Sequence, residues 1–296
     1  MNGPSRPTAK PANQSTGYQR LPSVKKIIAV GAGKGGVGKS TVAVNLAIAL
    51  SGLGASVGLL DGDIYGPSIP TMLGLRGVTP QIDEEKRKIK PLPAHGISCV
   101  SMGFLLKRDD AVVWRGPMLG KALQQFVDDV DWGELDYLVV DLPPGTGDVQ
   151  LSLAQLLSVH GAILVTTPQD VAHDDVARAA RMFELLEIPM LGVVENMAYF
   201  LCPDNDKTYY IFGEGKTESF ADKFGMELLE SFPLDLGVAP AGDIGVPITI
   251  SEPDGDQYQR YRRLAQGVAT RVAAMEHEEN SAEASQVFPQ PPIPEH

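Results

Sequence analysis

One short stretch, GAGKGGVGKST at residues 31–41, constrains the fold of this chain more than any other. It contains the pattern G-x-x-x-x-G-K-[ST], it follows the apolar run KKIIAV, and it leads into an apolar segment with helical spacing. In that setting the glycines let backbone N–H groups point inward, and the start of the helix adds partial positive charge. The sequence therefore predicts a phosphate-binding loop between a buried strand and a helix.

The side chains of this loop carry the expected nucleotide contacts. Lys39 is expected to contact the β- and γ-phosphates, and the Ser40 hydroxyl to ligate a magnesium ion. A second lysine, Lys34, follows the first glycine of the pattern, although the pattern does not require it. The loop residues predicted to bind the nucleotide are Gly33, Lys34, Gly35, Gly36, Val37, Gly38, Lys39, Ser40 and Thr41.

Short apolar runs alternate along the chain with longer stretches of helical spacing. This alternation is typical of parallel strands joined by right-handed crossovers. We therefore predict an α/β fold, a doubly wound and mostly parallel sheet with helices on both faces, which binds its ligand beyond the carboxyl ends of the strands. The expected strands cover residues 25–31, 55–61, 96–102, 135–141, 161–167 and 190–196, and the expected helices cover 41–54, 116–130 and 174–187.

The two ends of the chain differ in composition from the middle. Residues 1–23 are rich in Pro, Ser and Asn, and residues 276–296 are acidic and then Pro-rich, so neither is expected to bury a core. A basic start that contains Ser and Thr is also found in organelle transit peptides, but its prolines oppose an amphipathic helix. We expect one folded domain over residues 24–275 between two disordered tails.

Charge and cysteine content exclude several classes of partner. The net charge is −12 and the isoelectric point is near 4.9, so the long-range field opposes binding to nucleic acid or to an acidic membrane. No apolar run approaches the roughly 18 to 20 residues that a membrane-spanning helix needs. The chain has 2 cysteines, too few for a disulfide framework, and a reducing, cytoplasmic location is expected.

Carboxylates stand at the ends of two expected strands. Asp141 ends the run LDYLVVD, and Gly145 follows it in a loop that could meet a γ-phosphate. Asp61 and Asp63 lie at the end of the run ASVGLLD. Because the carboxyl ends of parallel strands meet at one edge of a sheet, we expect all three carboxylates beside the phosphate loop, where they can serve a metal ion.

Four segments together resemble a known family. GKGGVGKST, DGDIYGPSIP, DLPPGTGD and ENMAYF are similar to segments of the Mrp/ApbC-type P-loop ATPases, iron–sulfur cluster carriers of the MinD-like class with a deviant Walker A loop. The resemblance implies a slow, magnesium-dependent ATPase that works as a nucleotide-dependent homodimer and transfers clusters to apo iron–sulfur proteins. The implied cofactors are ATP and Mg²⁺, with a 4Fe-4S cluster bridging two subunits.

The same resemblance implies roles for single residues. Lys34 would reach across the homodimer to the phosphates held by the other subunit and, with Lys39, stabilise charge in the transition state. Asp63 would position or activate the attacking water, and Asp141 would hold magnesium through water. Asn196 would read the edge of the adenine, since an amide offers both a donor and an acceptor.

The C-x-x-C signature of the family is incomplete in this chain. Cys202 stands at its first position, but Asn205 stands at its second. An amide oxygen is a weak ligand for iron compared with a thiolate, so two Cys202 residues alone would hold a cluster poorly. Asp204 or Asp206 would add only oxygen ligands. Cys99 lies in a buried-strand pattern, where a free cysteine behaves as a small apolar residue.

Two other functions are compatible with the sequence. An ATP-switched client-binding protein without a cluster would fit the missing cysteine. A MinD- or ParA-like spatial regulator would need a basic amphipathic C-terminal helix or a basic face. The acidic, Pro-rich end of this chain counts against that second alternative.

Overall fold

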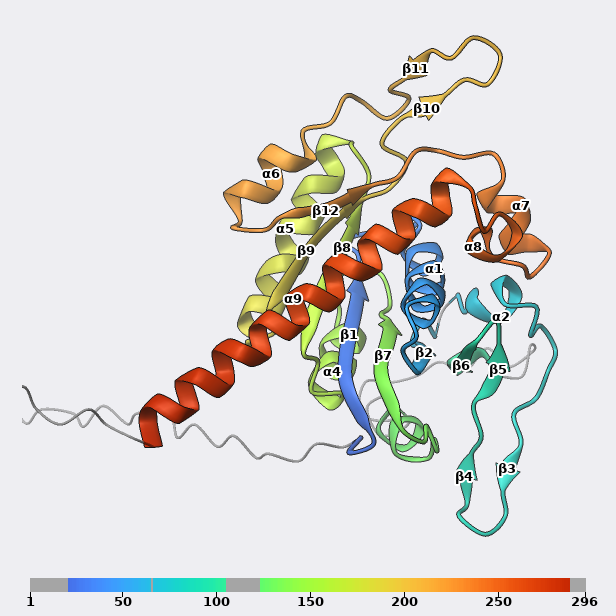
Figure 1. The fold of residues 1–296 in the computed structure, drawn as a ribbon, viewed down its shortest axis with the longest axis vertical. Helices are drawn as coiled ribbons and strands as arrows, with labels where there is room; N and C mark the ends of the chain where they lie inside the picture. The colour runs from blue at the N-terminus through green and yellow to red at the C-terminus, as the bar shows by residue number, and fades with distance from the viewer. Residues whose placement is uncertain (1–20, 65, 105–122, 288–296) are drawn as a thin grey trace, which may run out of the picture.

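The structure is a computed structural model and describes residues 21–64, 66–104 and 123–287 (Figure 1). Its centre is an 8-stranded sheet in the order β12-β9-β8-β1-β7-β2-β6-β5. All neighbours pair in parallel except β5 and β6, which confirms the predicted doubly wound, mostly parallel fold. The strands are β1 (Val24–Gly31), β2 (Val57–Asp61), β5 (Leu92–Ala94), β6 (Ile97–Ser101), β7 (Leu135–Asp141), β8 (Gly161–Thr166), β9 (Met190–Glu195) and β12 (Leu228–Ser231).

Helices cover both faces of this sheet. Helices α1 and α9 pack on one face, and α4 and α5 pack on the other (Figure 1). The helices are α1 (Lys39–Gly52), α2 (Ile69–Met72), α4 (Asp148–Leu156), α5 (Asp170–Leu185), α6 (Thr217–Lys223), α7 (Val238–Asp243), α8 (Ile248–Ser251) and α9 (Asp256–Val287), with a short 3-10 helix η1 (Met102–Phe104).

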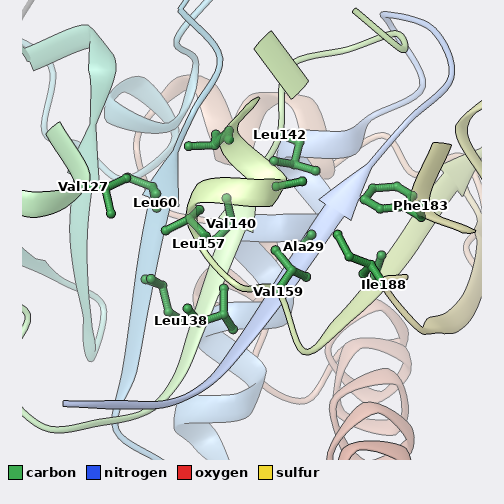
Figure 2. Close-up of a cluster of buried hydrophobic side chains, with 14 of the residues drawn as sticks. Ala29, Leu60, Val127, Leu138, Val140, Leu142, Leu157, Val159, Phe183 and Ile188 are labelled. Carbon is green, nitrogen blue, oxygen red and sulfur yellow. The ribbon is translucent and has the colours of Figure 1, made fainter. Parts of the chain in front are cut away.

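The sheet separates two apolar cores. On β1, Ile28 and Val30 belong to the core under α1 and α9, whereas Ala29 belongs to the core under α4 and α5. Figure 2 shows part of the second core, where Phe183 and Ile188 lie beside Ala29. Strands buried on both faces are apolar at every position rather than at alternate ones, which is why the sequence predicts them as continuous runs.

All six predicted strands are present, but other elements were not expected. The strands β5 and β12 at the two sheet edges are short and partly exposed, so they leave little apolar signal. Two hairpins were also not predicted from the sequence: β3 (Ile82–Asp83) with β4 (Lys88–Ile89), and β10 (Phe200–Leu201) with β11 (Thr208–Tyr209). The start of the expected helix over 116–130 lies outside the described residues, and residues 123–128 are helical.

The expected domain boundaries differ from the structure at both ends. Leu21 is buried in a core although it falls in the expected N-terminal tail. Helix α9 runs to Val287, well beyond residue 276, where a disordered tail was expected. The added stretch is rich in Ala and Glu, which favour helix. Residues 1–20 and 288–296 lie outside the described part. Within that part, no helix has the length and apolar character needed to cross a lipid bilayer.

Candidate nucleotide-binding site

The phosphate loop joins β1 to α1 and is packed too closely for larger residues at two glycines. A Cβ on Gly33 would overlap the backbone carbonyl group of Asp175 in α5. Gly38, at the start of α1, has a φ of 85°, and a Cβ there would overlap the amide of Asn196. Helix α5 and Asn196 therefore pack against the phosphate loop, and only glycine fits at positions 33 and 38.

A cavity lies in front of this loop and collects side chains that the sequence predicts for the site. Lys34, Lys39 and Ser40 line it, together with Asp63 and Thr41. The structure thus brings both loop lysines, the hydroxyl predicted to bind magnesium and one of the three strand-end carboxylates to the same hollow. This composition suits a charged, oxygen-rich ligand with a metal ion.

Asp141 binds both Lys39 and Ser40 beneath this cavity. The Lys39 ammonium Nζ lies 2.5 Å from Asp141 Oδ1, and the Ser40 hydroxyl donates to Asp141 Oδ2 at 2.6 Å. The side chain of Lys39 is 6% exposed and that of Asp141 is fully buried. Burial raises the pKa of the Asp141 carboxyl, while the ammonium of Lys39 opposes that rise. A phosphate that takes the ammonium must therefore compete with a buried carboxylate.

Asp61 lies directly beside Asp141 across the sheet. The two residues are register partners at the ends of β2 and β7, and both are fully buried. Ser101 Oγ donates a hydrogen bond of 2.8 Å to Asp61 Oδ2. Burial and, second to it, repulsion by Asp141 raise the pKa of Asp61 to about 7. The carboxyl edge of the sheet therefore holds two adjacent buried carboxyl groups, Asp141 beside the ammonium of Lys39 and Asp61 beside the hydroxyl of Ser101.

Asp63 and Gly145 lie on the two loops that flank these carboxyls. The Asp63 side chain lines the cavity, and its backbone N–H donates to Asp61 Oδ1 at 3.2 Å. Gly145 has a φ of 93°, and its N–H donates to the carbonyl of Ala32 at 3.0 Å. The Gly145 amide would have to leave Ala32 before it could meet a γ-phosphate.

Among the described residues, several that were predicted to contact the nucleotide do not line the cavity. Gly33 packs on α5, and Val37 is buried in the core. The Asn196 amide donates from Nδ2 to the Val37 carbonyl at 2.9 Å, so this side chain supports the phosphate loop from behind. The expected contact of Asn196 with adenine stays a prediction.

Lys34 has a partner that sequence reasoning missed. Its Nζ donates to Oε1 of Gln169 at 3.0 Å, and both side chains are partly buried. Gln169 follows the end of β8 at the same edge of the sheet as the phosphate loop. Its position shortly after a predicted strand was the only signal in the sequence, because a lone glutamine has no motif.

The cysteine predicted to bind a cluster does not line this cavity; it lies in the turn of the β10–β11 hairpin, whose two strands are labelled in Figure 1. The Cys202 carbonyl accepts from Asp206 N at 2.9 Å. Asn205 closes the same turn, since its Oδ1 accepts from Lys207 N at 3.0 Å and its Nδ2 donates to Tyr209 Oη at 3.3 Å. Asn205 therefore has a structural role where the family signature would place a second thiolate.

The other cysteine is confirmed as part of the core. Cys99 lies in β6 between β2 and β5 and is fully buried, and burial raises its pKa well above the usual value. Within the described residues, no group of three His, Cys, Asp or Glu side chains could hold a metal ion. The described part of one chain thus offers a single accessible thiol for a cluster.

Comparison with known proteins places the chain among iron-transfer proteins. The model of the family described as NUBPL iron-transfer P-loop NTPase matches residues 23–269. A protein of Aquifex aeolicus named iron-sulfur cluster carrier protein is 54% identical over 248 residues, 83% of this chain and 68% of that protein. The iron-sulfur cluster transfer protein NUBPL of Dictyostelium discoideum is 45% identical over 260 residues, 88% of this chain and 80% of that protein.

Solved structures share the fold of this chain. A nucleotide-binding protein of Archaeoglobus fulgidus in complex with ADP is 38% identical, with a TM-score of 0.71 over 82% of this chain and 94% of that chain. The cell division ATPase MinD of Pyrococcus furiosus, at 21% identity and a TM-score of 0.62 over 83% of this chain and 99% of that chain, has the same fold. The resemblance to the Mrp/ApbC-type carriers is confirmed, and the chain belongs to the NUBPL iron-transfer P-loop NTPase family.

Proposed function

We propose that this protein is an ATP-driven carrier that binds iron–sulfur clusters and transfers them to apo iron–sulfur proteins, working as a nucleotide-dependent homodimer. The observation that carries the proposal is the arrangement of Lys39 and Ser40 around Asp141 at the phosphate loop of a chain in this family. The names of the relatives, carrier and transfer proteins for iron–sulfur clusters, support the choice of cargo.

The residues present fit a magnesium nucleotide. Hydroxyl and carboxylate oxygens, as in Ser40 and Asp141, are the ligands that Mg²⁺ prefers. When bound, the ion neutralises charge on the phosphates. Lys39 then exchanges its buried carboxylate partner for phosphate oxygens, and the nucleotide replaces one charge-assisted contact with another.

The proposed reaction is slow hydrolysis of ATP to ADP and phosphate. Asp63 accepts a hydrogen bond from the attacking water and orients it, which its place on the cavity wall supports. Lys34 of a second copy adds positive charge as negative charge shifts toward the leaving oxygen. Asn196 binds the adenine edge. Hydrolysis in this proposal depends on assembly of two copies, because one catalytic cation comes from each.

The cluster is cargo in this proposal, held between two hairpins. One chain offers Cys202, so two copies supply two thiolates, whereas a four-iron cluster is usually held by four. A cluster held by half the usual thiolates is bound weakly, which suits a protein that must release it. Asp204 and Asp206 are exposed on the same turn and complete the site only as weak oxygen ligands.

The test is iron and sulfide content after anaerobic reconstitution. Two variants that each remove one cysteine form a matched pair: Cys202→Ala and Cys99→Ala. We expect Cys202→Ala to lose bound iron and Cys99→Ala to retain it, because the Cys99 thiol is fully buried. Equal iron in both variants would remove Cys202 from the proposal.

A second candidate function rests on Asn205. Its side chain makes two hydrogen bonds inside the hairpin, so the turn is stable without a metal. An ATP-switched protein that binds clients through this hairpin, without a cluster, would need no second thiolate. Wild-type protein that takes up no iron while still hydrolysing ATP would favour this candidate.

A further inference from the structure

The contact between Lys34 and Gln169 indicates a role for a residue that no motif identifies. We infer that Gln169 is a positioning residue for Lys34: it holds the lysine ammonium within its own chain until a second copy with bound nucleotide accepts it. The inference rests on the proposed function, in which Lys34 acts on the nucleotide of the second copy.

The Gln169 side chain is available for this role because it has no part in starting the next helix. Gln169 is the residue before α5, in extended conformation, and its side chain makes no capping hydrogen bond. The first turn of the helix is instead stabilised by a backbone hydrogen bond, in which Ala172 N donates to the Gln169 carbonyl at 2.9 Å. Replacing the side chain therefore removes the contact with Lys34 and leaves the backbone bond in place.

The fold places the two side chains together. Lys34 follows Gly33, and Gly33 packs directly on the backbone of Asp175 in α5. Gln169 precedes that same helix. The loop and the helix start are therefore fixed relative to each other, and the 3.0 Å contact from Nζ to Oε1 follows from that packing.

The chemistry of the acceptor allows release. An amide oxygen is neutral, so it holds an ammonium group less strongly than a carboxylate does. Among the residues whose side chains the structure describes, Lys34 forms no ion pair, whereas Lys39 is held by the buried Asp141. Phosphates on a second copy carry more negative charge than the neutral amide of Gln169, so they would displace it as the partner of Lys34.

The hydrogen bond between Lys34 and Gln169 opposes assembly of the two copies. A second copy gains the Lys34 contact only after the bond to Gln169 breaks, so the strength of that bond determines the protein concentration at which the two copies become active. Weakening this bond should lower that concentration, and a carboxylate in place of the Gln169 amide should raise it.

The experiment measures phosphate release per chain against protein concentration for wild type, Gln169→Ala and the isosteric Gln169→Glu. We expect Gln169→Ala to reach half its maximal rate at about 3- to 10-fold lower protein concentration, the range for loss of one hydrogen bond of ordinary strength at a partly exposed position. Gln169→Glu should shift the midpoint in the opposite direction. Matched changes at Gln155, an exposed glutamine of α4, should leave the curve unchanged.

Two further results separate this inference from the function on which it rests. If the wild-type rate per chain does not depend on concentration, the two-copy reaction is wrong. If the wild-type rate does depend on concentration but the Gln169 curves coincide with it, the two-copy reaction stands and Gln169 has no positioning role. In a Lys34→Ala background, Gln169→Glu should cause no further shift. A shift there would mean that Gln169 acts on the nucleotide directly, and would overturn the inference.

Discussion

The phosphate-loop edge of the sheet and the β10–β11 hairpin differ in how much of a site one chain completes. At the edge, the ends of β1, β2 and β7 are buried, and Asp141 pairs with Lys39 in the core. The hairpin has strands of 2 residues each, and its exposed side chains include Leu201 at 51% and Tyr209 at 45%. One chain therefore builds most of the proposed nucleotide site, whereas the hairpin offers one thiol and an exposed apolar surface.

The difference shows which parts of the function depend on a second copy. Interactions inside a rigid core can be complete within one chain, and the Lys39–Asp141 pair is an example. Lys34 and Cys202 lie at partly exposed positions, and each lacks within the described part of its own chain the partner that the proposed function requires. We expect substitutions in the buried site to change properties that one chain has by itself, such as nucleotide binding. We expect substitutions at Lys34 or in the hairpin to change only properties that need two chains.

The largest effect is expected for Lys39→Ala. The change removes the main countercharge of the phosphates and leaves Asp141 buried without its lysine, so it should abolish ATP binding and lower the free energy of unfolding by about 3 kcal/mol. A binding isotherm and urea unfolding measure the two effects. Lys25→Ala is the control, because its pair with Asp136 is exposed to solvent and contributes little to stability. Normal ATP turnover in Lys39→Ala would contradict the nucleotide site.

Lys34→Ala should leave ATP binding intact and slow hydrolysis by about a thousandfold, as for loss of a cation supplied from a second subunit. The measurement pairs a nucleotide-binding isotherm with a rate at high protein concentration. A parallel loss of binding and rate would mean that Lys34 serves the nucleotide of its own chain, and the contrast between the two lysines would fail.

Asn205→Cys should make the hairpin a better cluster site. Two copies then bring four thiolates together, so reconstituted iron should rise toward the content of one four-iron cluster per pair, with stronger visible absorption. The variant also loses the hydrogen bonds to Lys207 and Tyr209, which costs about 1 kcal/mol each at most. ATP hydrolysis should not change. A variant without iron would show that the two hairpins do not meet.

A smaller effect concerns the pH dependence of the buried edge. The pKa of Asp61 is raised to about 7 by burial and then by Asp141, so the folded protein keeps a proton that the unfolded chain loses near pH 4. The stability of the nucleotide-free protein should therefore fall as pH rises through 7, and Asp61→Asn should flatten this dependence. Asp204→Asn, on the exposed hairpin, should not. Urea midpoints between pH 5 and 8 provide the test, and identical curves for wild type and Asp61→Asn would contradict it.

The same contrast explains what the sequence could predict. The strands and the positions of Asp61 and Asp141 were predictable because doubly buried strands give continuous apolar runs that end at one edge. The contacts of Gln169 and Asn205 were not, since each depends on a single amide whose partner is fixed by three-dimensional packing or by a local turn. The length of α9 was missed because acidic composition was taken as a sign of disorder, although Ala and Glu favour helix.

The most direct test of the account is native mass spectrometry of the anaerobically reconstituted wild-type protein. The hairpin of one chain has one thiol, so a cluster should be found only on species that contain two chains, and Cys202→Ala should remove it from them. Clusters on single chains at the same occupancy as on pairs would show that one hairpin is a complete site, and would contradict the account.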